Sequence, residues 1–312
     1  MSGTKIVVLG TGGTLAGTSA IAGDNVGYAA AQIGVAQLLA AIPAMRGLPL
    51  EAEQVAQIDS KDMSFAIWRD LALRCAHWLA QEDVGGIVVT HGTDTLEETA
   101  YFLQEVLGPT KPVVITCAMR PATALTPDGP QNIVDAIAVA STEGARGVLG
   151  VCAGVVHGPR EVMKVHHYRL NPFSSGDAGP VGYVEEGRLR QLRPWPEGER
   201  QRARHRLEKA TSTTAWPRVD IVMSHAGADG TIVRALLVQG VAGLVVAATG
   251  NGTIHADLLV ALLEAQKHGV RIVRASRCAE GGVIASHEDP IPATDLSPVK
   301  ARIELLLELL EA

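Results

Sequence analysis

The chain is poor in aromatic residues and in cysteine. Only three of its 312 residues are Phe, so Val, Leu, Ala and Ile must build the core. The four cysteines show no CxxC pair and no Cys/His cluster at the spacing of metal ligands. We therefore expect free thiols, a reducing compartment and no bound metal. The cysteines are Cys75, Cys117, Cys152 and Cys278.

Long apolar runs and an excess of positive charge are also missing. No apolar run reaches the roughly 18 residues that span a bilayer, and no apolar signal segment precedes the first predicted strand. The formal net charge of -6 gives no electrostatic reason to expect nucleic acid as a partner. These absences predict a cytoplasmic protein that binds neither membrane nor nucleic acid.

Apolar runs typical of buried strands alternate with stretches of helical periodicity, such as residues 65–79. This alternation predicts βαβ units and a mainly parallel sheet. The predicted fold class is α/β, with a larger N-terminal domain whose sheet is flanked by helices and a smaller C-terminal α/β domain. The strands are expected at 6–9, 87–90, 113–116 and 148–152, and then near 219–223, 243–247 and 270–274.

A segment of different composition separates the two predicted domains. Residues 193–217 contain the dense charge run 199–206, and the run has no interleaved aromatic residues. That composition favours a solvated linker over a patch for an acidic partner. We therefore predict an N-terminal domain at 1–192, a linker at 193–217 and a C-terminal domain at 218–312.

Two turns rich in hydroxyl groups follow predicted strands. The first is Gly10-Thr11-Gly12-Gly13-Thr14-Leu15, and the second lies within Thr90–Thr99. Open α/β sheets bind their ligands at the carboxyl ends of strands, so the two turns predict a site in which Thr is a nucleophile. The first turn lacks the third Gly of GxGxxG and a Walker lysine, which argues against NAD or ATP. Thr14 could also simply bond its own turn.

The second turn combines two patterns. Thr95-Leu96-Glu97-Glu98 fits a capping box, which would use Thr95 and Glu98 to begin a helix. A cap does not explain Thr93, whereas Asp94 could also favour the positive end of the helix. The pattern as a whole favours a functional role for both Thr93 and Asp94. Lys164 is either a surface lysine or a desolvated base for a hydroxyl, and its position in the sequence does not choose between the two.

Several short segments occur in an order that is informative as a set. They are Thr11–Gly17, His91–Thr99, Ala118-Met119-Arg120-Pro121, Asp128-Gly129-Pro130, Gly250-Asn251-Gly252 and Ala275-Ser276-Arg277. In this order the chain resembles the bacterial-type L-asparaginases, from residue 5 to about residue 310.

The resemblance implies an amidohydrolase that converts L-asparagine to L-aspartate and ammonia through an acyl-enzyme, without a cofactor. It implies that Thr14 is the nucleophile and that Tyr28 is a lid tyrosine beside it. It further implies that Thr93 and Lys164 are a second threonine with its lysine base, and that Asp94 binds the α-amino group. An amide is a poor electrophile, so its hydrolysis requires such an activated hydroxyl and a proton donor for ammonia.

The same resemblance suggests how the substrate is held. Ser60 matches a serine that binds the α-carboxylate, and Lys61 stands where many family members have Gln. Lys61 is either ordinary variation at this position or an added positive charge beside that carboxylate. Asn251 and Glu288 match residues that reach an active site across a subunit interface, which implies a homo-oligomer, either a dimer or a tetramer.

Other functions remain open for this sequence. The enzyme could prefer glutamine, a D-amino acid amide or a lactam. A non-catalytic amino-acid-binding protein is a further alternative. The combination of Thr14, Thr93, Asp94 and Lys164 argues against that alternative, because binding alone requires neither two threonines nor a lysine base.

Overall fold

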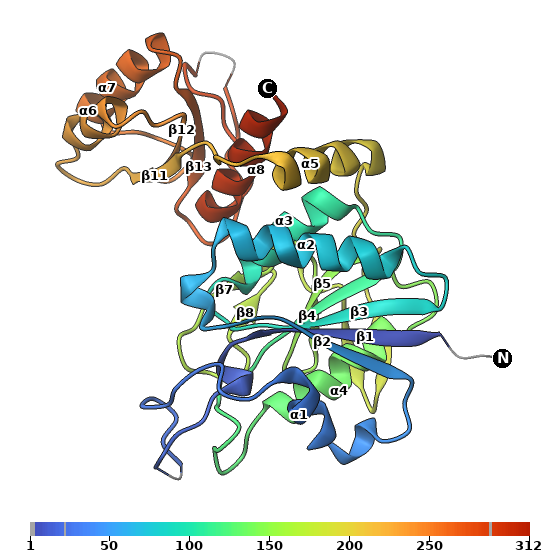
Figure 1. Cartoon of the computed structure of the whole chain (residues 1–312). Helices are drawn as coiled ribbons and strands as arrows, with labels where there is room; N and C mark the ends of the chain where they lie inside the picture. Colours follow the sequence, from blue (N-terminus) through green and yellow to red (C-terminus); the bar gives the residue numbers. More distant parts are fainter. Residues whose placement is uncertain (1–3, 22, 287–288) are drawn as a thin grey trace. The chain divides into compact units, whose positions relative to one another are not determined.

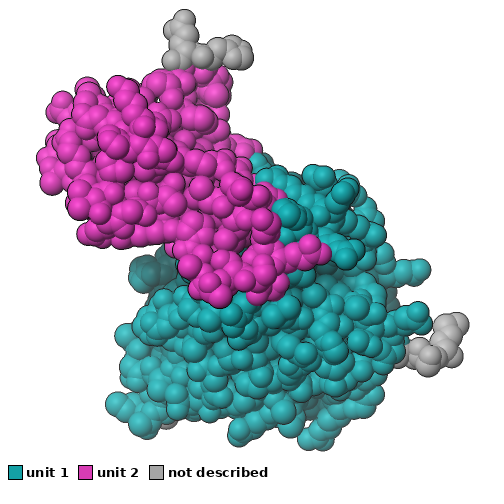
Figure 2. All heavy atoms as spheres, turned by 45° about the horizontal axis from the view of Figure 1, so that its top comes forward, with its two compact units in different colours: residues 1–207 teal, residues 208–312 magenta. Residues whose placement is uncertain are grey.

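The computed structural model describes residues 4–21, 23–286 and 289–312 and has an α/β fold (Figure 1). The chain forms two compact units, Met1–Leu207 and Glu208–Ala312 (Figure 2). Their division falls within the segment 193–217. The limits 1–192 and 218–312 remain a prediction for the domains.

An eight-stranded sheet forms the centre of the first unit, in the order β10-β9-β6-β5-β4-β3-β1-β2. The strands from β2 to β5 in this order pair in parallel, and the remaining pairs are antiparallel. The predicted mainly parallel sheet is therefore confirmed. The strands are β1 (Lys5–Gly12), β2 (Leu50–Ile58), β3 (Val84–Thr90), β4 (Pro112–Thr116), β5 (Gly147–Cys152), β6 (Val155–His157), β9 (Gly182–Glu185) and β10 (Arg188–Gln191).

Helices cover both faces of this sheet, with α2 and α3 on one side and α1 and α4 on the other (Figure 1). Strand residues alternate between the two faces, so Val8 and Val88 join the core formed with Leu38 and Ile133. The helical face predicted in residues 65–79 is buried at its centre. The helices are α1 (Val35–Ala40), α2 (Phe65–Leu79), α3 (Leu96–Leu107), α4 (Gly129–Ala140) and α5 (Arg200–Ser212).

The second unit has a parallel three-stranded sheet in the order β11-β12-β13. Its three strands lie where the sequence predicted strands, and the α/β class of this unit is confirmed. Its core is built from aliphatic side chains of the strands and of α6 and α7. Its elements are β11 (Val219–Met223), β12 (Gly243–Ala248), β13 (Arg271–Ser276), α6 (Thr231–Val238), α7 (Ala256–Lys267) and α8 (Pro298–Glu311). Within the described ranges of both units, every helix is too short or too polar to cross a bilayer.

The charge run 199–206 is not solvated throughout, which corrects the expectation for this segment. It forms the start of α5, where Arg206 is 1% exposed. The Arg206 guanidinium lies 2.5 Å from the Glu105 carboxylate on α3, while Arg204 faces solvent. The run therefore packs one buried charged side chain, Arg206, against α3 through an ion pair with the partly buried Glu105.

Removing one partner of a buried ion pair leaves the other charge without compensation. We expect Arg206→Ala to lower the free energy of unfolding by about 3 kcal/mol. The exposed Arg204→Ala should change it by less than about 0.5 kcal/mol. Urea unfolding followed by circular dichroism measures both. Equal effects of the two substitutions would show that Arg206 does not anchor α5.

Candidate active site

The turns after β1 and β3 touch through glycines. Gly12 and Gly13 have backbone φ angles of +107° and +82°. L-residues with a side chain rarely adopt such angles. A Cβ added to Gly13 would lie 2.5 Å from the backbone nitrogen of Gly92. The absence of a side chain therefore allows the turn that bears Thr14 to pack against the turn that bears Thr93.

A third strand end completes this cluster. Ser60 follows β2, the neighbour of β1, and begins the short 3-10 helix Ser60–Asp62. A Cβ on Gly92 would collide with the Ser60 hydroxyl. The Asp94 amide donates a hydrogen bond to Ser60 Oγ at 3.2 Å. Three adjacent parallel strands thus bring their predicted site residues to one edge of the sheet.

Thr14 and Tyr28 form a close pair. Their hydroxyl oxygens are 2.6 Å apart, and Thr14 is 8% exposed. The Tyr28 ring lies over Gly17, where an added Cβ would be 2.8 Å from a ring carbon. Burial raises the pKa of Tyr28 above 10, and the charges of Asp59 and Asp94 raise it further against the opposing Thr14 hydrogen bond. Tyr28 is therefore a neutral phenol near neutral pH.

Lys164 reaches the second turn from a distant part of the chain. It lies on β7 (Met163–Lys164), which pairs with β8 (Phe173–Ser174). Its ammonium nitrogen is 2.8 Å from Thr93 Oγ1 and 2.5 Å from Asp94 Oδ1. Its side chain therefore contacts a hydroxyl and is only 18% exposed, while its role as a base stays a prediction.

The Lys61 ammonium group is paired with two neighbouring carboxylates. Its ammonium nitrogen lies 3.1 Å from Asp59 Oδ2 and 2.8 Å from Asp62 Oδ2. Hydrogen bonds to Asp62 and Asp59 raise the pKa of Lys61. One ammonium therefore stands against two carboxylates, and the local balance beside Ser60 is negative.

The remaining predicted residues belong to the second unit. Asn251 follows β12, and its side-chain amide makes two hydrogen bonds to the backbone of Ile284, at 3.0 and 2.7 Å. Glu288 lies outside the described residues. Their predicted role across a subunit interface stays a prediction.

His91 was not assigned a role from the sequence, yet it supports the second turn. It is fully buried, and its Nδ1 donates to the Gly92 carbonyl at 2.7 Å. Its Nε2 accepts from the Thr99 hydroxyl at 3.0 Å, which in turn accepts from the Trp68 indole at 2.9 Å. Burial lowers the pKa of His91 from 6.5 to about 4, so the ring is neutral and holds the Gly92 peptide in place.

The capping-box prediction is wrong for Thr95. Thr95 is the N-cap residue of α3, but its side chain makes no capping hydrogen bond. Its hydroxyl donates instead to the Ser60 carbonyl oxygen at 2.8 Å. Thr95 therefore does not cap the helix but bonds the segment that is predicted to bind the substrate.

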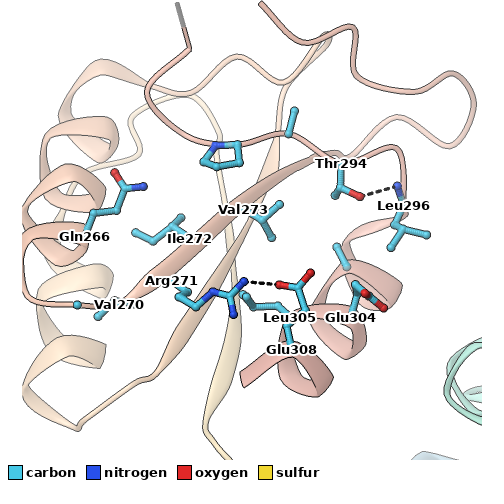
Figure 3. Close-up of a pocket in the computed structure, with 14 residues that line it drawn as sticks. Gln266, Val270, Arg271, Ile272, Val273, Thr294, Leu296, Glu304, Leu305 and Glu308 are labelled. Carbon is cyan, nitrogen blue, oxygen red and sulfur yellow. Dashed lines mark hydrogen bonds and ion pairs between the residues drawn. The ribbon is translucent and has the colours of Figure 1, made fainter. Parts of the chain in front are cut away.

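A cavity of about 640 Å³ lies elsewhere, in the second unit, between β13 and α8 (Figure 3). Its wall carries the ion pair between Arg271 and Glu308. Of the predicted site residues within the described part of the chain, none lines this cavity. Over the same part of the chain, no group of three His, Cys, Asp or Glu side chains is arranged to hold a metal ion.

Comparisons with known proteins agree with this fold. Residues 5–196 match the family model "Asparaginase, N-terminal", and residues 218–311 match "Glutaminase/Asparaginase C-terminal domain". The glutaminase-asparaginase of Pseudomonas fluorescens biotype A is 37% identical over 98% of this chain and 86% of that protein. L-asparaginase 2 of Escherichia coli K12 is 35% identical over 98% of this chain and 88% of that protein.

A solved structure extends the agreement to three dimensions. The probable cytoplasmic L-asparaginase from Campylobacter jejuni has a TM-score of 0.92 and 36% identity, over 99% of this chain and 96% of its own. Together these matches define the class of the protein, which is an α/β amide hydrolase. The chain belongs to the asparaginase family and is a hydrolase of the L-asparaginase type.

The neutral, buried His91 predicts a pH dependence of stability. Between pH 6.5 and about 4 the unfolded chain binds a proton at this ring and the folded chain does not. The free energy of unfolding therefore rises with pH in this window, and it should fall by about 2–3 kcal/mol from pH 7 to 4.5. Urea unfolding at the two pH values measures this loss. His91→Gln should lack this pH-dependent loss of unfolding free energy, whereas the variant His77→Gln, at an exposed histidine, should keep it. Identical losses in both variants would show that His91 is not its source.

Proposed function

We propose that the protein hydrolyses the side-chain amide of L-asparagine to L-aspartate and ammonia, with Thr14 as the nucleophile. The observation that carries this proposal is the pair of hydroxyl sites on touching turns. Thr14 pairs with Tyr28 at 2.6 Å, and Thr93 pairs with Lys164 at 2.8 Å. Relatives named L-asparaginase support the choice of substrate.

In the first half of the proposed reaction, Thr14 Oγ1 attacks the amide carbon, and the carbonyl oxygen becomes an oxyanion. The C–N bond then breaks, and the nitrogen takes a proton and leaves as ammonia. Backbone N–H groups of the glycine turn can stabilise the oxyanion. Tyr28 is neutral, so it acts as a hydrogen-bonding relay for the Thr14 proton and not as a permanent base.

In the second half, water attacks the resulting ester, and aspartate leaves with regeneration of the Thr14 hydroxyl. Thr93 and Lys164, whose side chains are in direct contact, relay the proton that the attacking water loses to the leaving Thr14 oxygen. This division gives each of the two threonines a separate task. It also explains why a lysine is brought to this edge from a distant strand.

The α-groups of the substrate bind at the other side of the second turn. Asp94 directs Oδ1 toward Lys164, which leaves Oδ2 to receive the α-ammonium group. The Ser60 hydroxyl, held by the Asp94 amide, binds the α-carboxylate. The two groups are thus recognised by neighbouring residues that already contact one another.

Glutamine is the second candidate substrate. Its amide undergoes the same chemistry, and one relative of high similarity is named a glutaminase-asparaginase. A single additional methylene changes recognition by only about 1–3 kcal/mol in a typical pocket. We therefore propose asparagine as the preferred substrate, with glutamine as a slower one.

We further propose that the enzyme is cytoplasmic and works as a homo-oligomer. Its four cysteines are free thiols, which suits a reducing compartment. The solved relative from Campylobacter jejuni is named a probable cytoplasmic L-asparaginase. A dimer or tetramer would allow Asn251 and Glu288 to complete a neighbouring subunit's site, as the family resemblance implies.

Removal of the Thr14 hydroxyl tests the nucleophile. Thr14→Ala should retain less than about 1% of wild-type ammonia release from L-asparagine. It should still bind L-aspartate in calorimetry, because the groups that hold the product remain. Thr14→Ser is the matched control, since it keeps a hydroxyl.

Ammonia release is measured for L-Asn, D-Asn, L-Gln and simple amides. If the wild type releases none while the amino acids still stabilise it against heat, it is a binding protein.

Lys61→Gln tests the charge balance beside the substrate carboxylate. The change leaves Asp59 and Asp62 without their shared cation. We expect KM for L-asparagine to rise about fivefold with little change in kcat, since the carboxylates repel the substrate. The rise should shrink at 1 M salt, where the screening length is about 3 Å. Lys61→Arg is the control that keeps the charge. Unchanged KM values in Lys61→Gln for every substrate would refute this role.

A further inference from the structure

The first turn of α3 makes contacts that its capping function does not explain. Thr95 stands at the N-cap, a position where a Thr hydroxyl ordinarily accepts from a helix amide. Here that hydroxyl donates to the Ser60 carbonyl oxygen at 2.8 Å, and it makes no capping bond. The helix thus begins without its usual side-chain cap, while the hydroxyl serves a different segment.

The segment that Thr95 holds is the one proposed to bind the substrate carboxylate. Ser60 is 2% exposed. Its hydroxyl accepts from the Asp94 amide at 3.2 Å, and its carbonyl accepts from Thr95. The two bonds hold the hydroxyl group and the carbonyl group of Ser60 against the turn at residues 92–95. The Thr95 bond therefore sets the orientation in which the Ser60 hydroxyl faces the site.

Glu97, two residues after Thr95, contacts the Lys164 segment as Thr95 contacts the Ser60 segment. Glu97 is 9% exposed, although a carboxylate in the first turn of a helix can remain solvated. Its Oε1 accepts from the backbone N–H of Lys164 at 3.3 Å. Lys164 lies on the two-residue strand β7, which is outside the eight-stranded sheet and pairs with the equally short β8. The contact ties this short strand to a long, well-packed helix.

We infer that the first turn of α3 is a positioning element for both halves of the site. Thr95 orients Ser60 for the substrate carboxylate, and Glu97 places Lys164 so that its ammonium nitrogen reaches Thr93 and Asp94. Neither residue touches the substrate, and each acts through the residue that it holds. This inference rests on the proposed function and adds two residues to it.

The Thr95 contact predicts a selective effect on substrate binding. Thr95→Val keeps the shape of the side chain and removes the donor. We expect KM for L-asparagine to rise about tenfold while kcat stays within about threefold, because a buried hydrogen bond is lost on the binding side. Thr95→Ser should restore the KM. Thr110→Val, at an exposed threonine, is the matched control and should change neither constant.

A second variant separates this role from helix stability. Glycine is nearly as good as threonine at an N-cap, so Thr95→Gly keeps the helix start and lacks the hydroxyl. A raised KM in Thr95→Gly, with a melting temperature near that of the wild type, supports the positioning role even if Thr95→Val folds poorly. A wild-type KM in Thr95→Gly overturns it.

The Glu97 contact predicts the opposite kinetic pattern. Glu97→Leu removes the acceptor for the Lys164 amide, and we expect kcat to fall about tenfold with KM within about threefold. Glu97→Gln keeps an acceptor oxygen and should retain most of the kcat. The exposed Glu143→Leu is the matched control. Each kcat is expressed per binding site, counted by calorimetric titration with L-aspartate, so that a misfolded fraction is not read as slow chemistry.

The outcomes distinguish a failure of this inference from a failure of the proposed function. If the wild type releases no ammonia from any amide, the proposed function falls, and the inference falls with it. If the wild type is active but Thr95→Gly leaves KM unchanged, or Glu97→Leu leaves kcat unchanged, the inference alone is wrong. Equal loss of kcat in Glu97→Gln and Glu97→Leu would also overturn it, since the lost charge would then matter and the backbone contact would not.

Discussion

The whole candidate site depends on the contact between backbone turns at the ends of β1 and β3. Gly13 and Gly92 approach so closely that a single Cβ on either would collide with the neighbouring turn or with Ser60. A close-packed interior resists even small additions of volume. The glycines therefore determine how near the two threonine turns can be.

Electrostatics then gives the two turns different properties. The turn at Thr14 is paired with a neutral phenol, whereas the turn at Thr93 is paired with an ammonium–carboxylate pair. A pair of hydroxyl sites with unlike partners can treat the two halves of an acyl transfer differently. The neutral His91 behind the second turn adds no charge of its own to this arrangement. The site's charges therefore come from the residues that face the substrate.

Much of this was predictable from local sequence. Apolar runs followed by hydroxyl-rich turns predicted parallel strands with a site at their carboxyl ends, because strand burial and strand-end turns are local properties. The pairing of Thr93 with Lys164 was not predictable from spacing. The two residues are 71 positions apart, and only the path of β7 brings them together. The family resemblance supplied this pairing where periodicity could not.

Local sequence patterns did not predict the bonding partner of a polar residue where two partners were possible. Thr95 satisfied the capping box as a sequence, but its hydroxyl found the Ser60 carbonyl on another strand end. Arg206 satisfied the pattern of a solvated run, but Glu105 on α3 offered a partly buried carboxylate. Lys61 adds a positive charge in the sequence, and in the fold Asp59 and Asp62 both pair with it. In each case a polar group bonded where the folded chain placed a partner, which a one-dimensional pattern does not encode.

The same constraint bears on the choice between asparagine and glutamine. In the proposed reaction both amides place their carbonyl carbon at Thr14 while their α-groups bind near Ser60 and Asp94. The two side chains differ by one methylene group. Close glycine contacts fix the distance between the two turns, so the site cannot expand to fit the longer side chain of glutamine. The extra length must then be taken up at the α-groups, where Lys61 and its carboxylates stand on the exposed side. Substrate preference in this protein should therefore be set at the α-group end of the site, while the rigid nucleophile end treats both amides alike.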